Sequence, residues 1–162
     1  MATRQILQPT NRETLLEVSD AELGRGVRIR EKGIDFVVRT VPHRKQRYET
    51  SGDWIPGDPA EIRVSKLKNR LYVYLIAVHE MTEYAGCAGK KDIDQRSITF
   101  DLLFELERKA KLHGPFDEPG DDRRAPYYAD HQAATEDEKH EAAKLGVDWD
   151  SYEKAVNRLR RN

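Results

Sequence analysis

The sequence predicts an α+β fold, in which a small antiparallel sheet is followed by a helical half. Between residues 27 and 65, apolar residues alternate with polar ones, which is the pattern of half-buried strands. After residue 67 the apolar residues follow a helical period, and glycines and prolines separate the segments. The sequence contains no internal repeat, so we expect an N-terminal arm over residues 1–25 and a single domain over residues 26–162.

The strands are predicted from three segments. Residues 27–29 and 34–38 alternate on either side of Gly33, which is typical of two strands joined by a turn. A third strand is expected through the basic stretch at residues 44–47, before turns that flank Trp54 and Ile55. Residues 61–65 alternate again and predict a short strand.

Four helices are expected in the second half. Residues 67–84 contain neither proline nor glycine and are apolar around most of the helix circumference, which predicts a buried central helix. The second helix is expected to run from Asp94 or Ser97 to Leu112, followed by a proline-rich acidic loop at residues 115–126. The remaining helices are predicted over residues 127–145 and 150–159. The inward stripe of the second helix is expected to comprise Ile98, Leu102, Leu103, Leu106 and Ala110.

Composition limits the class of protein. Charged residues make up 35% of the chain and hydrophobic residues 38%, which predicts a compact core under a charged surface. The formal net charge of −1 argues against dedicated nucleic-acid binding. Cys87 is the single cysteine, which excludes an intramolecular disulfide and a four-cysteine zinc site. The longest apolar run, residues 71–78, is too short to span a bilayer, and no secretory signal is visible. We expect a cytoplasmic protein with no membrane partner.

The most distinctive motif lies in the predicted central helix. His79 and Glu83 are four residues apart, so they lie on one face of the helix within reach of a common metal ion. Glu80 is rotated by about 100° from His79 and can hold a water molecule beside that metal. Polar groups in a buried helix cost free energy unless they are paired or bind a metal. We therefore predict one divalent metal ion, with zinc as the expected element, held by His79 and Glu83.

A third protein ligand is needed. We favour His131, because two histidines and one carboxylate form a usual catalytic zinc set. Thr135 and Glu138 continue the helix face of His131. Four further residues are alternative ligands or supporting groups: Asp101, Glu105, Asp121 and Tyr128. Asp101 is the second choice, as a ligand or as the carboxylate that orients a histidine. An all-carboxylate site would favour Mg²⁺ or Mn²⁺.

Residues 79–83 resemble the His-Glu-x-x-His helix of the zincin metallopeptidases, with Glu83 in place of the second histidine. This resemblance implies a zincin-like fold and a peptide or protein substrate. It implies that Glu80 is the catalytic general base. In zincins a strand beside the helix pairs with the substrate backbone, and residues 61–65 occupy the corresponding place in this sequence.

A longer segment, residues 60–152, is similar to a group of uncharacterised proteins encoded by bacteriophages and prophages. The shared features are the motif at residues 79–83, the Phe100-Asp101 step, the Glu-Pro-Gly-Asp-Asp segment at residues 118–122, and Pro-Tyr-x-x-x-His at residues 126–131. This similarity implies a phage origin and a host-cytoplasm setting, but no particular activity.

Three functions are compatible with these features. The preferred one is a metal-dependent hydrolase, most like a peptidase. In the second, Glu80 and Glu83 with Asp101 and Glu105 resemble the paired acidic helices of all-α nucleotide pyrophosphohydrolases, which use Mg²⁺. In the third, a zincin fold without catalytic activity binds a protein partner, which the glutamate at position 83 favours. The oligomeric state, the substrate and the role of the arm are left open.

Overall fold

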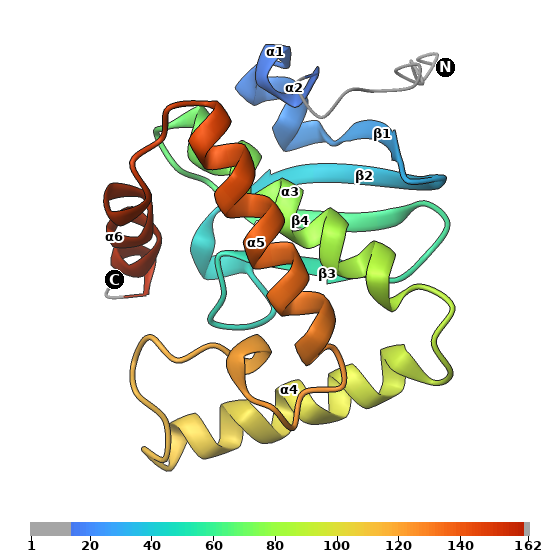
Figure 1. Ribbon diagram of the computed structural model, residues 1–162, viewed down its shortest axis with the longest axis vertical. Coiled ribbons are helices and arrows are strands. Elements are labelled where there is room, and N and C mark those ends of the chain that lie inside the picture. Colours follow the sequence, from blue (N-terminus) through green and yellow to red (C-terminus); the bar gives the residue numbers. More distant parts are fainter. Residues whose placement is uncertain (1–13, 161–162) are drawn as a thin grey trace.

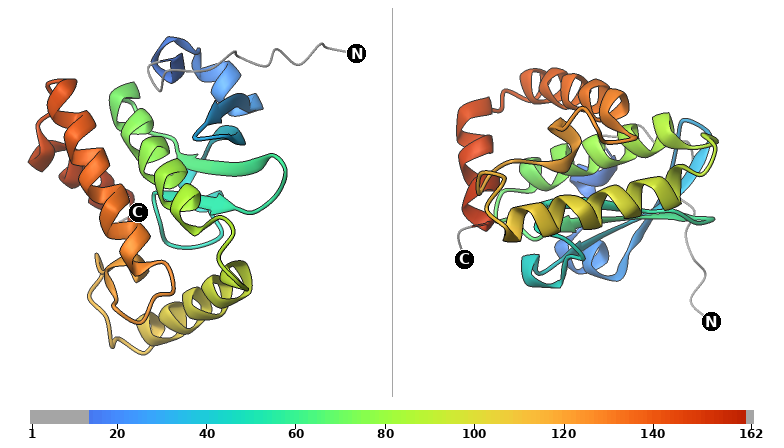
Figure 2. Two further views of the ribbon diagram at one scale, coloured as in Figure 1. Left: turned by 45° about the vertical axis from the view of Figure 1, so that its right-hand side comes forward. Right: turned by 90° about the horizontal axis from the view of Figure 1, so that it is seen from below.

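The computed structural model describes residues 14–160 as a four-stranded sheet followed by a helical half (Figures 1 and 2). The strands are β1 (Val27–Glu31), β2 (Ile34–Val41), β3 (Gly52–Ile55) and β4 (Ala60–Ser65). The helices are α1 (Thr14–Glu17), α2 (Asp20–Arg25), α3 (Arg70–Cys87), α4 (Ile93–Lys109), α5 (Tyr128–Lys144) and α6 (Trp149–Leu159). Two 3₁₀ turns are η1 (His43–Lys45) and η2 (Pro119–Asp121). The predicted α+β class and the order of sheet before helices are confirmed.

The sheet is mixed, so the prediction of an antiparallel sheet is wrong for one of its pairs. The strand order is β1-β2-β4-β3, with β1/β2 and β3/β4 antiparallel but β2/β4 parallel. Phe36 lies opposite Ala60, and Val41 lies opposite Ser65. The reason is the connection through residues 42–51. It places β3 one strand away from β2, and the returning strand β4 fills the gap and therefore runs parallel to β2.

The third strand lies later in the chain than predicted. Residues 43–45 of the basic stretch form η1, and the strand begins at Gly52, within the segment expected to be a turn. Strand β4 has a hydrogen-bonded neighbour on both sides. Residues 61–65 therefore cannot be the edge strand that the zincin resemblance implied. On that side of the sheet the edge strand is β3.

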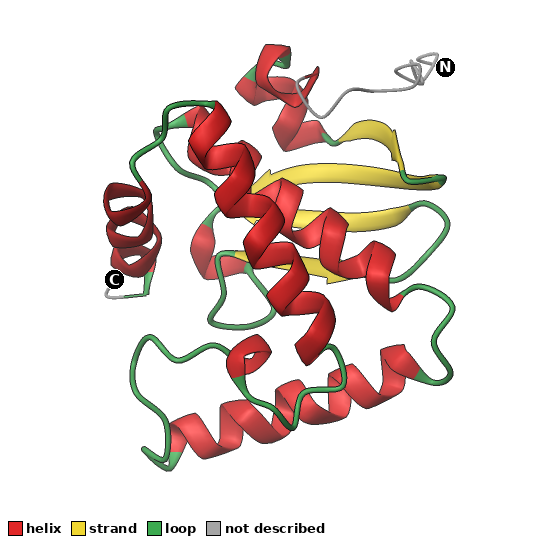
Figure 3. Cartoon of the chain, viewed as in Figure 1, coloured by secondary structure: helices red, strands yellow, loops and turns green. Residues whose placement is uncertain are grey.

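Helix α3 is the centre of the molecule and lies between the sheet and α5 (Figure 3). Residues 73–81 are all buried, because the sheet covers one side of the helix and α5 covers the other. This confirms the buried central helix. Asn69 caps the helix by accepting a hydrogen bond from the Leu71 amide, and the helix continues past Gly86 to Cys87.

Helix α4 lies across one end of the molecule, and its predicted inward stripe is wrong (Figure 1). Leu102 and Leu106 are 54% and 64% exposed, whereas Phe100 and Phe104 are buried. The helix carries both an aliphatic face and an aromatic face. The aromatic face is the buried one, because it finds ring partners: Phe100 packs edge-on against Tyr127 at 6.4 Å between ring centres.

The described part of the N-terminal arm, residues 14–25, forms the short helices α1 and α2. Ser19 and Glu22 make a reciprocal capping box at the start of α2. Leu15 and Leu23 are buried and join the core formed by the sheet and α3. None of the described helices is long and apolar enough to cross a membrane.

Candidate metal centre

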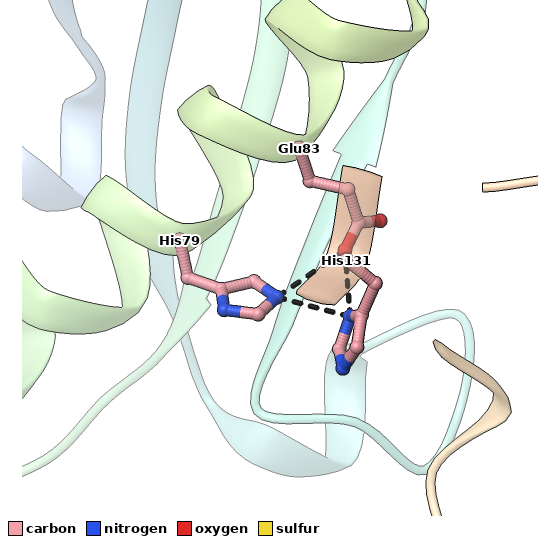
Figure 4. A group of neighbouring side chains, drawn as sticks. All are labelled: His79, Glu83 and His131. Atoms are coloured by element: carbon pink, nitrogen blue, oxygen red, sulfur yellow. Dashed lines mark hydrogen bonds and ion pairs between the residues drawn. The ribbon is translucent and has the colours of Figure 1, made fainter. Parts of the chain in front are cut away.

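Helices α3 and α5 bring two histidines and one glutamate together (Figure 4). His79 Nε2 lies 3.2 Å from Glu83 Oε2 and 3.1 Å from His131 Nδ1. His131 Nδ1 lies 2.7 Å from Glu83 Oε2, which closes a triangle of three ligand atoms. The three residues are 8%, 5% and 7% exposed, in chain order. We call His79, Glu83 and His131 the His–Glu–His centre.

The secondary structure explains this convergence. His79 and Glu83 lie one turn apart on α3, and His131 lies in the first turn of α5, which packs along α3. Gly120 in η2 lies directly against the His131 ring, and an added Cβ at this position would overlap the ring atoms. The turn at η2 therefore restricts the position of the His131 ring.

The donor set fits a tetrahedral metal ion. Zinc bonds of about 2.0–2.1 Å to nitrogen and oxygen place neighbouring ligand atoms about 3.3 Å apart. The separations in the centre are 2.7, 3.1 and 3.2 Å, so small rotations of the side chains would accommodate an ion. Two imidazoles and one carboxylate leave a fourth position open, which is the arrangement of catalytic rather than structural zinc sites.

A second carboxylate orients His79. Glu138 on α5 lies 2.8 Å from His79 Nδ1 through Oε2, while the Tyr152 hydroxyl donates a hydrogen bond to Glu138 Oε1. Both partners are buried. A carboxylate on Nδ1 holds the proton there and leaves the Nε2 lone pair free for a metal.

The other two residues of the centre also have outer partners. The Trp54 indole on β3 donates a hydrogen bond of 2.6 Å to Glu83 Oε1, which leaves Oε2 directed at the histidines. On the far side of the His131 ring, Nε2 lies 3.5 Å from Asp121 Oδ1 and 3.9 Å from Glu118 Oε2. Each ligand candidate is thus held by a residue from a different element, which is typical of a metal site.

The charges of the centre are strongly coupled. Burial on its own raises the pKa of Glu83, but hydrogen bonds from His131 and His79 outweigh it and lower that pKa to about 2. Burial lowers the pKa of His131, yet its hydrogen bonds to Asp121 and Glu83 raise it to about 9. Burial also opposes the charging of His79, whose pKa is nevertheless raised by hydrogen bonds to Glu138 and Glu83. The centre therefore favours positive charge between these groups, which a metal ion would provide in place of protons.

Glu80 lies beside the His–Glu–His centre but forms no hydrogen bond with its three residues. Its side chain is buried and lines the same cavity, and among the described residues none donates a hydrogen bond to its carboxylate. Burial, followed by the nearby charge of Glu83, raises the pKa of Glu80 well above its ordinary value. The backbone of β3 approaches it so closely at Gly52 that a Cβ there would overlap the Glu80 carboxylate. Burial and the neighbouring charge of Glu83 therefore favour the uncharged form of Glu80 in the metal-free centre.

The centre forms part of the wall of a cavity of about 310 Å³. The other walls include strand β3, the segments at residues 47–51 and 116–121, and helices α4 and α6. Three of the alternative site residues line it: Asp101, Glu105 and Asp121. Tyr128 does not, and its neighbour Tyr127 lines the cavity instead.

Asp101 has a different role from the one expected of a histidine-orienting carboxylate. Its Oδ1 accepts a hydrogen bond from the Tyr127 hydroxyl, and Glu138 occupies the position beside His79. Glu105 pairs with Arg108 at 3.4 Å. Neither Asp101 nor Glu105 belongs to a group of three converging ligand atoms among the described residues.

Sequence reasoning did not assign roles to Glu138, Trp54 and Tyr152. Glu138 carried a usable signal, because it lies seven residues after His131 and therefore on the same face of α5. Trp54 and Tyr152 carried none, since each reaches the centre from an element that is distant in the sequence.

The fold and the centre together define the class: a mixed α+β domain with a buried His–Glu–His cluster that opens into a cavity. Comparison of the chain with protein-family models, with curated proteins and with solved structures found no significant match.

Proposed function

We propose that this protein is a zinc-dependent hydrolase that cleaves peptide bonds. The observation that carries the proposal is the convergence of His79 Nε2, Glu83 Oε2 and His131 Nδ1 within 3.2 Å of one another at the wall of a cavity. Two histidines with one carboxylate suit zinc better than Mg²⁺ or Mn²⁺. The free carboxylate of Glu80 beside them supplies the base that such a reaction needs.

The residues have distinct roles in this proposal. His79, Glu83 and His131 would hold the zinc ion, which would supply a Lewis acid and would lower the pKa of bound water to about 7. Glu80 would accept the proton from the attacking water; a cation in the centre would lower the raised pKa of Glu80 and favour the carboxylate form that a base requires. Glu138 keeps the proton of His79 on Nδ1, and Trp54 holds Glu83 in place.

A peptide substrate is supported by the sheet. Strand β3 is the edge strand on the cavity side, and Gly52, Asp53 and Trp54 line the cavity. An extended peptide can pair with such an edge through backbone hydrogen bonds. A zincin-like relation, with α3 as the motif helix and β3 as the edge strand, is part of the proposal, as is a bacteriophage origin.

The Mg²⁺-dependent nucleotide hydrolase is the less favoured alternative. It requires Asp101 and Glu105 to join Glu80 and Glu83 as an all-oxygen site. Asp101 is instead bonded to Tyr127, and Glu105 is paired with Arg108.

The test compares metal content and hydrolysis. We expect about one equivalent of zinc in the purified wild-type protein and none in Glu83→Ala or His131→Ala. Glu80→Gln should keep its zinc and lose peptide hydrolysis by roughly 100-fold or more, because the general base is removed. Elemental analysis and a fluorogenic peptide library provide the two readouts. Absence of zinc would overturn the proposal, and zinc without hydrolysis would favour a protein-binding module.

A further inference from the structure

The cavity is strongly acidic although the whole chain is nearly neutral. The chain carries a formal charge of −1, yet eleven carboxylate side chains line the cavity. Apart from two histidines, Arg47 is the one basic side chain among the described lining residues. A divalent ion in the His–Glu–His centre would offset two of these negative charges. Among the other carboxylates, Asp53, Glu105 and Glu118 are paired with Arg47, Arg108 and Arg160. The carboxylates that have no arginine partner make the cavity electronegative, which attracts a cationic ligand.

The single guanidinium of the cavity is already engaged. Arg47 holds Asp53 of β3 through two hydrogen bonds, from Nε at 2.7 Å and from Nη2 at 3.0 Å. This pairing satisfies the Asp53 carboxylate on one wall of the cavity. The charge of Arg47 also lowers the pKa of Asp101 on α4, but among the described residues Arg47 forms neither a hydrogen bond nor an ion pair with that carboxylate.

Helix α4 turns one face toward the cavity. Asp94, Ser97, Asp101 and Glu105 line it, and their spacings of three and four residues place them on one side of the helix. Ser97 is 3% exposed, and its Oγ has no hydrogen-bond partner among the described residues. A buried hydroxyl without a partner costs free energy. Because Ser97 lines the cavity, a ligand donor that reaches its hydroxyl would supply the missing bond.

Asp101 lies one turn after Ser97 and has spare acceptor capacity. Its Oδ1 accepts the Tyr127 hydroxyl, while a carboxylate offers about four acceptor positions. Burial, only partly offset by the Tyr127 hydrogen bond, raises the pKa of Asp101 to about 7. A cation beside this carboxylate would stabilise its ionised form and so lower its pKa.

We propose that Ser97 and Asp101 form a subsite that binds a lysine or arginine side chain of the peptide substrate beside the metal centre. An ammonium group carries three donors and a guanidinium five, so either can bond the Ser97 oxygen and the Asp101 carboxylate together. An apolar side chain would leave the Ser97 hydroxyl without a partner and would give Asp101 no bond beyond that from Tyr127. The subsite rests on the proposed peptidase function, since it assumes that the occupant is part of a peptide.

The test is a binding measurement made separately from catalysis. The zinc-treated Glu80→Gln protein is titrated with fluorescent hexapeptides of alanine in which lysine occupies each position in turn. Matched peptides carry norleucine, which has a similar shape and no charge. The best lysine peptide should bind about tenfold more tightly than its norleucine partner, because hydrogen bonds to charged groups are worth more than those to neutral ones.

Two variants locate the effect. In the Glu80→Gln background, Asp101→Asn should bring the lysine-to-norleucine ratio close to unity, and Ser97→Ala should reduce it by a few fold. The asparagine oxygen can still accept the Tyr127 hydroxyl, so the fold is expected to survive. Asp92→Asn is the matched control: it removes one carboxylate at the start of the same helix, from an exposed position outside the cavity lining. Circular dichroism and zinc content verify each variant.

The outcomes separate this proposal from the proposed function. A lysine preference that disappears in Asp101→Asn but not in Asp92→Asn supports the subsite, even if the wild-type protein cleaves no peptide. Equal affinity for lysine and norleucine at every position would overturn the subsite, even if the wild-type protein is an active peptidase. The same titration in EDTA gives the ratio without zinc, so the result does not depend on the metal.

Discussion

Histidines and carboxylates converge at two places in the described part of the chain, and the two clusters differ in what neutralises their charge. The His–Glu–His centre is buried, and among the described residues its carboxylate forms ion pairs with histidines alone. The second cluster consists of Glu107, His113 and Asp122 and is half-buried. We call it the Arg124 cluster, because Arg124 bridges Glu107 at 2.8 Å and Asp122 at 2.7 Å.

The Arg124 cluster already contains its cation. The guanidinium of Arg124 binds both carboxylates, and the pKa of Glu107 is lowered to about 2 by its hydrogen bonds with Arg124 and His113. The His113 ring is stacked on Phe104 at 3.9 Å between ring centres, which restricts its rotation. A metal ion would have to displace an arginine here. In the His–Glu–His centre it would displace only protons.

The comparison shows that proximity of ligand-type side chains does not define a metal site. What distinguishes the His–Glu–His centre is that, within the described residues, neither lysine nor arginine pairs with Glu83 or Glu138. Its outer partners Trp54, Tyr152 and Glu138 instead hold the side chains so that the three ligand atoms are directed at one another.

The largest expected difference is in metal content. His79→Ala should abolish zinc binding, because it removes one of three ligands and leaves too few to hold an ion. His113→Ala is the matched change in the Arg124 cluster and should leave zinc content unchanged. Elemental analysis of both purified variants checks this. Loss of zinc in His113→Ala with retention in His79→Ala would contradict this prediction and place the metal in the Arg124 cluster.

A smaller effect is expected from the outer carboxylates. Glu138→Gln should weaken zinc affinity by about 10–100-fold, because the amide orients His79 less strongly and does not stabilise its charge. Glu107→Gln makes the same change in the Arg124 cluster and should not alter zinc affinity. Competition with a chromophoric chelator measures both constants. Equal weakening in the two variants would show that net charge, rather than the contact with His79, is responsible.

The sequence was sufficient to predict the elements that carry local signals. The density of apolar residues predicted α3 as a buried helix, and the spacing of His79 and Glu83 placed them on one face. The direction of strand pairing carried no such signal. An alternating strand has the same pattern whether its neighbour is parallel or antiparallel, so the parallel pair β2/β4 could not be predicted.

Long-range packing accounts for the rest of what was missed. Helix α4 has two apolar faces, and the sequence could not indicate that Phe100 and Phe104 rather than Leu102 and Leu106 find partners. The contact of Trp54 with Glu83 depends on β3 lying beside α3, which follows from the mixed sheet. The position of Glu138 could have been predicted from the sequence, because helical spacing alone aligns it with His131.

The smallest expected effect is a dependence of stability on pH that only the metal-free centre should show. Without metal, His131 has a pKa of about 9, raised from 6.5, so its contribution to stability is complete below pH 6.5 and is lost as the pH rises through 9. Glu83, with its pKa lowered to about 2, contributes above pH 4.5 and is ionised throughout this range. Burial raises the pKa of Asp101 to about 7, so ionising it reduces stability in the same direction as the pH rises.

The EDTA-treated protein should therefore melt roughly 5 °C lower at pH 9 than at pH 6. The zinc-loaded protein should change less, because the metal replaces the proton of His131 and binds more tightly as protons are removed. The Arg124 cluster cannot supply this difference through Glu107, whose lowered pKa keeps it ionised at both values. Thermal denaturation at the two pH values, with EDTA or with zinc, gives the four melting temperatures. An equal drop with and without zinc would mean that the pH effect arises outside the His–Glu–His centre, and would remove the distinction drawn between the two clusters.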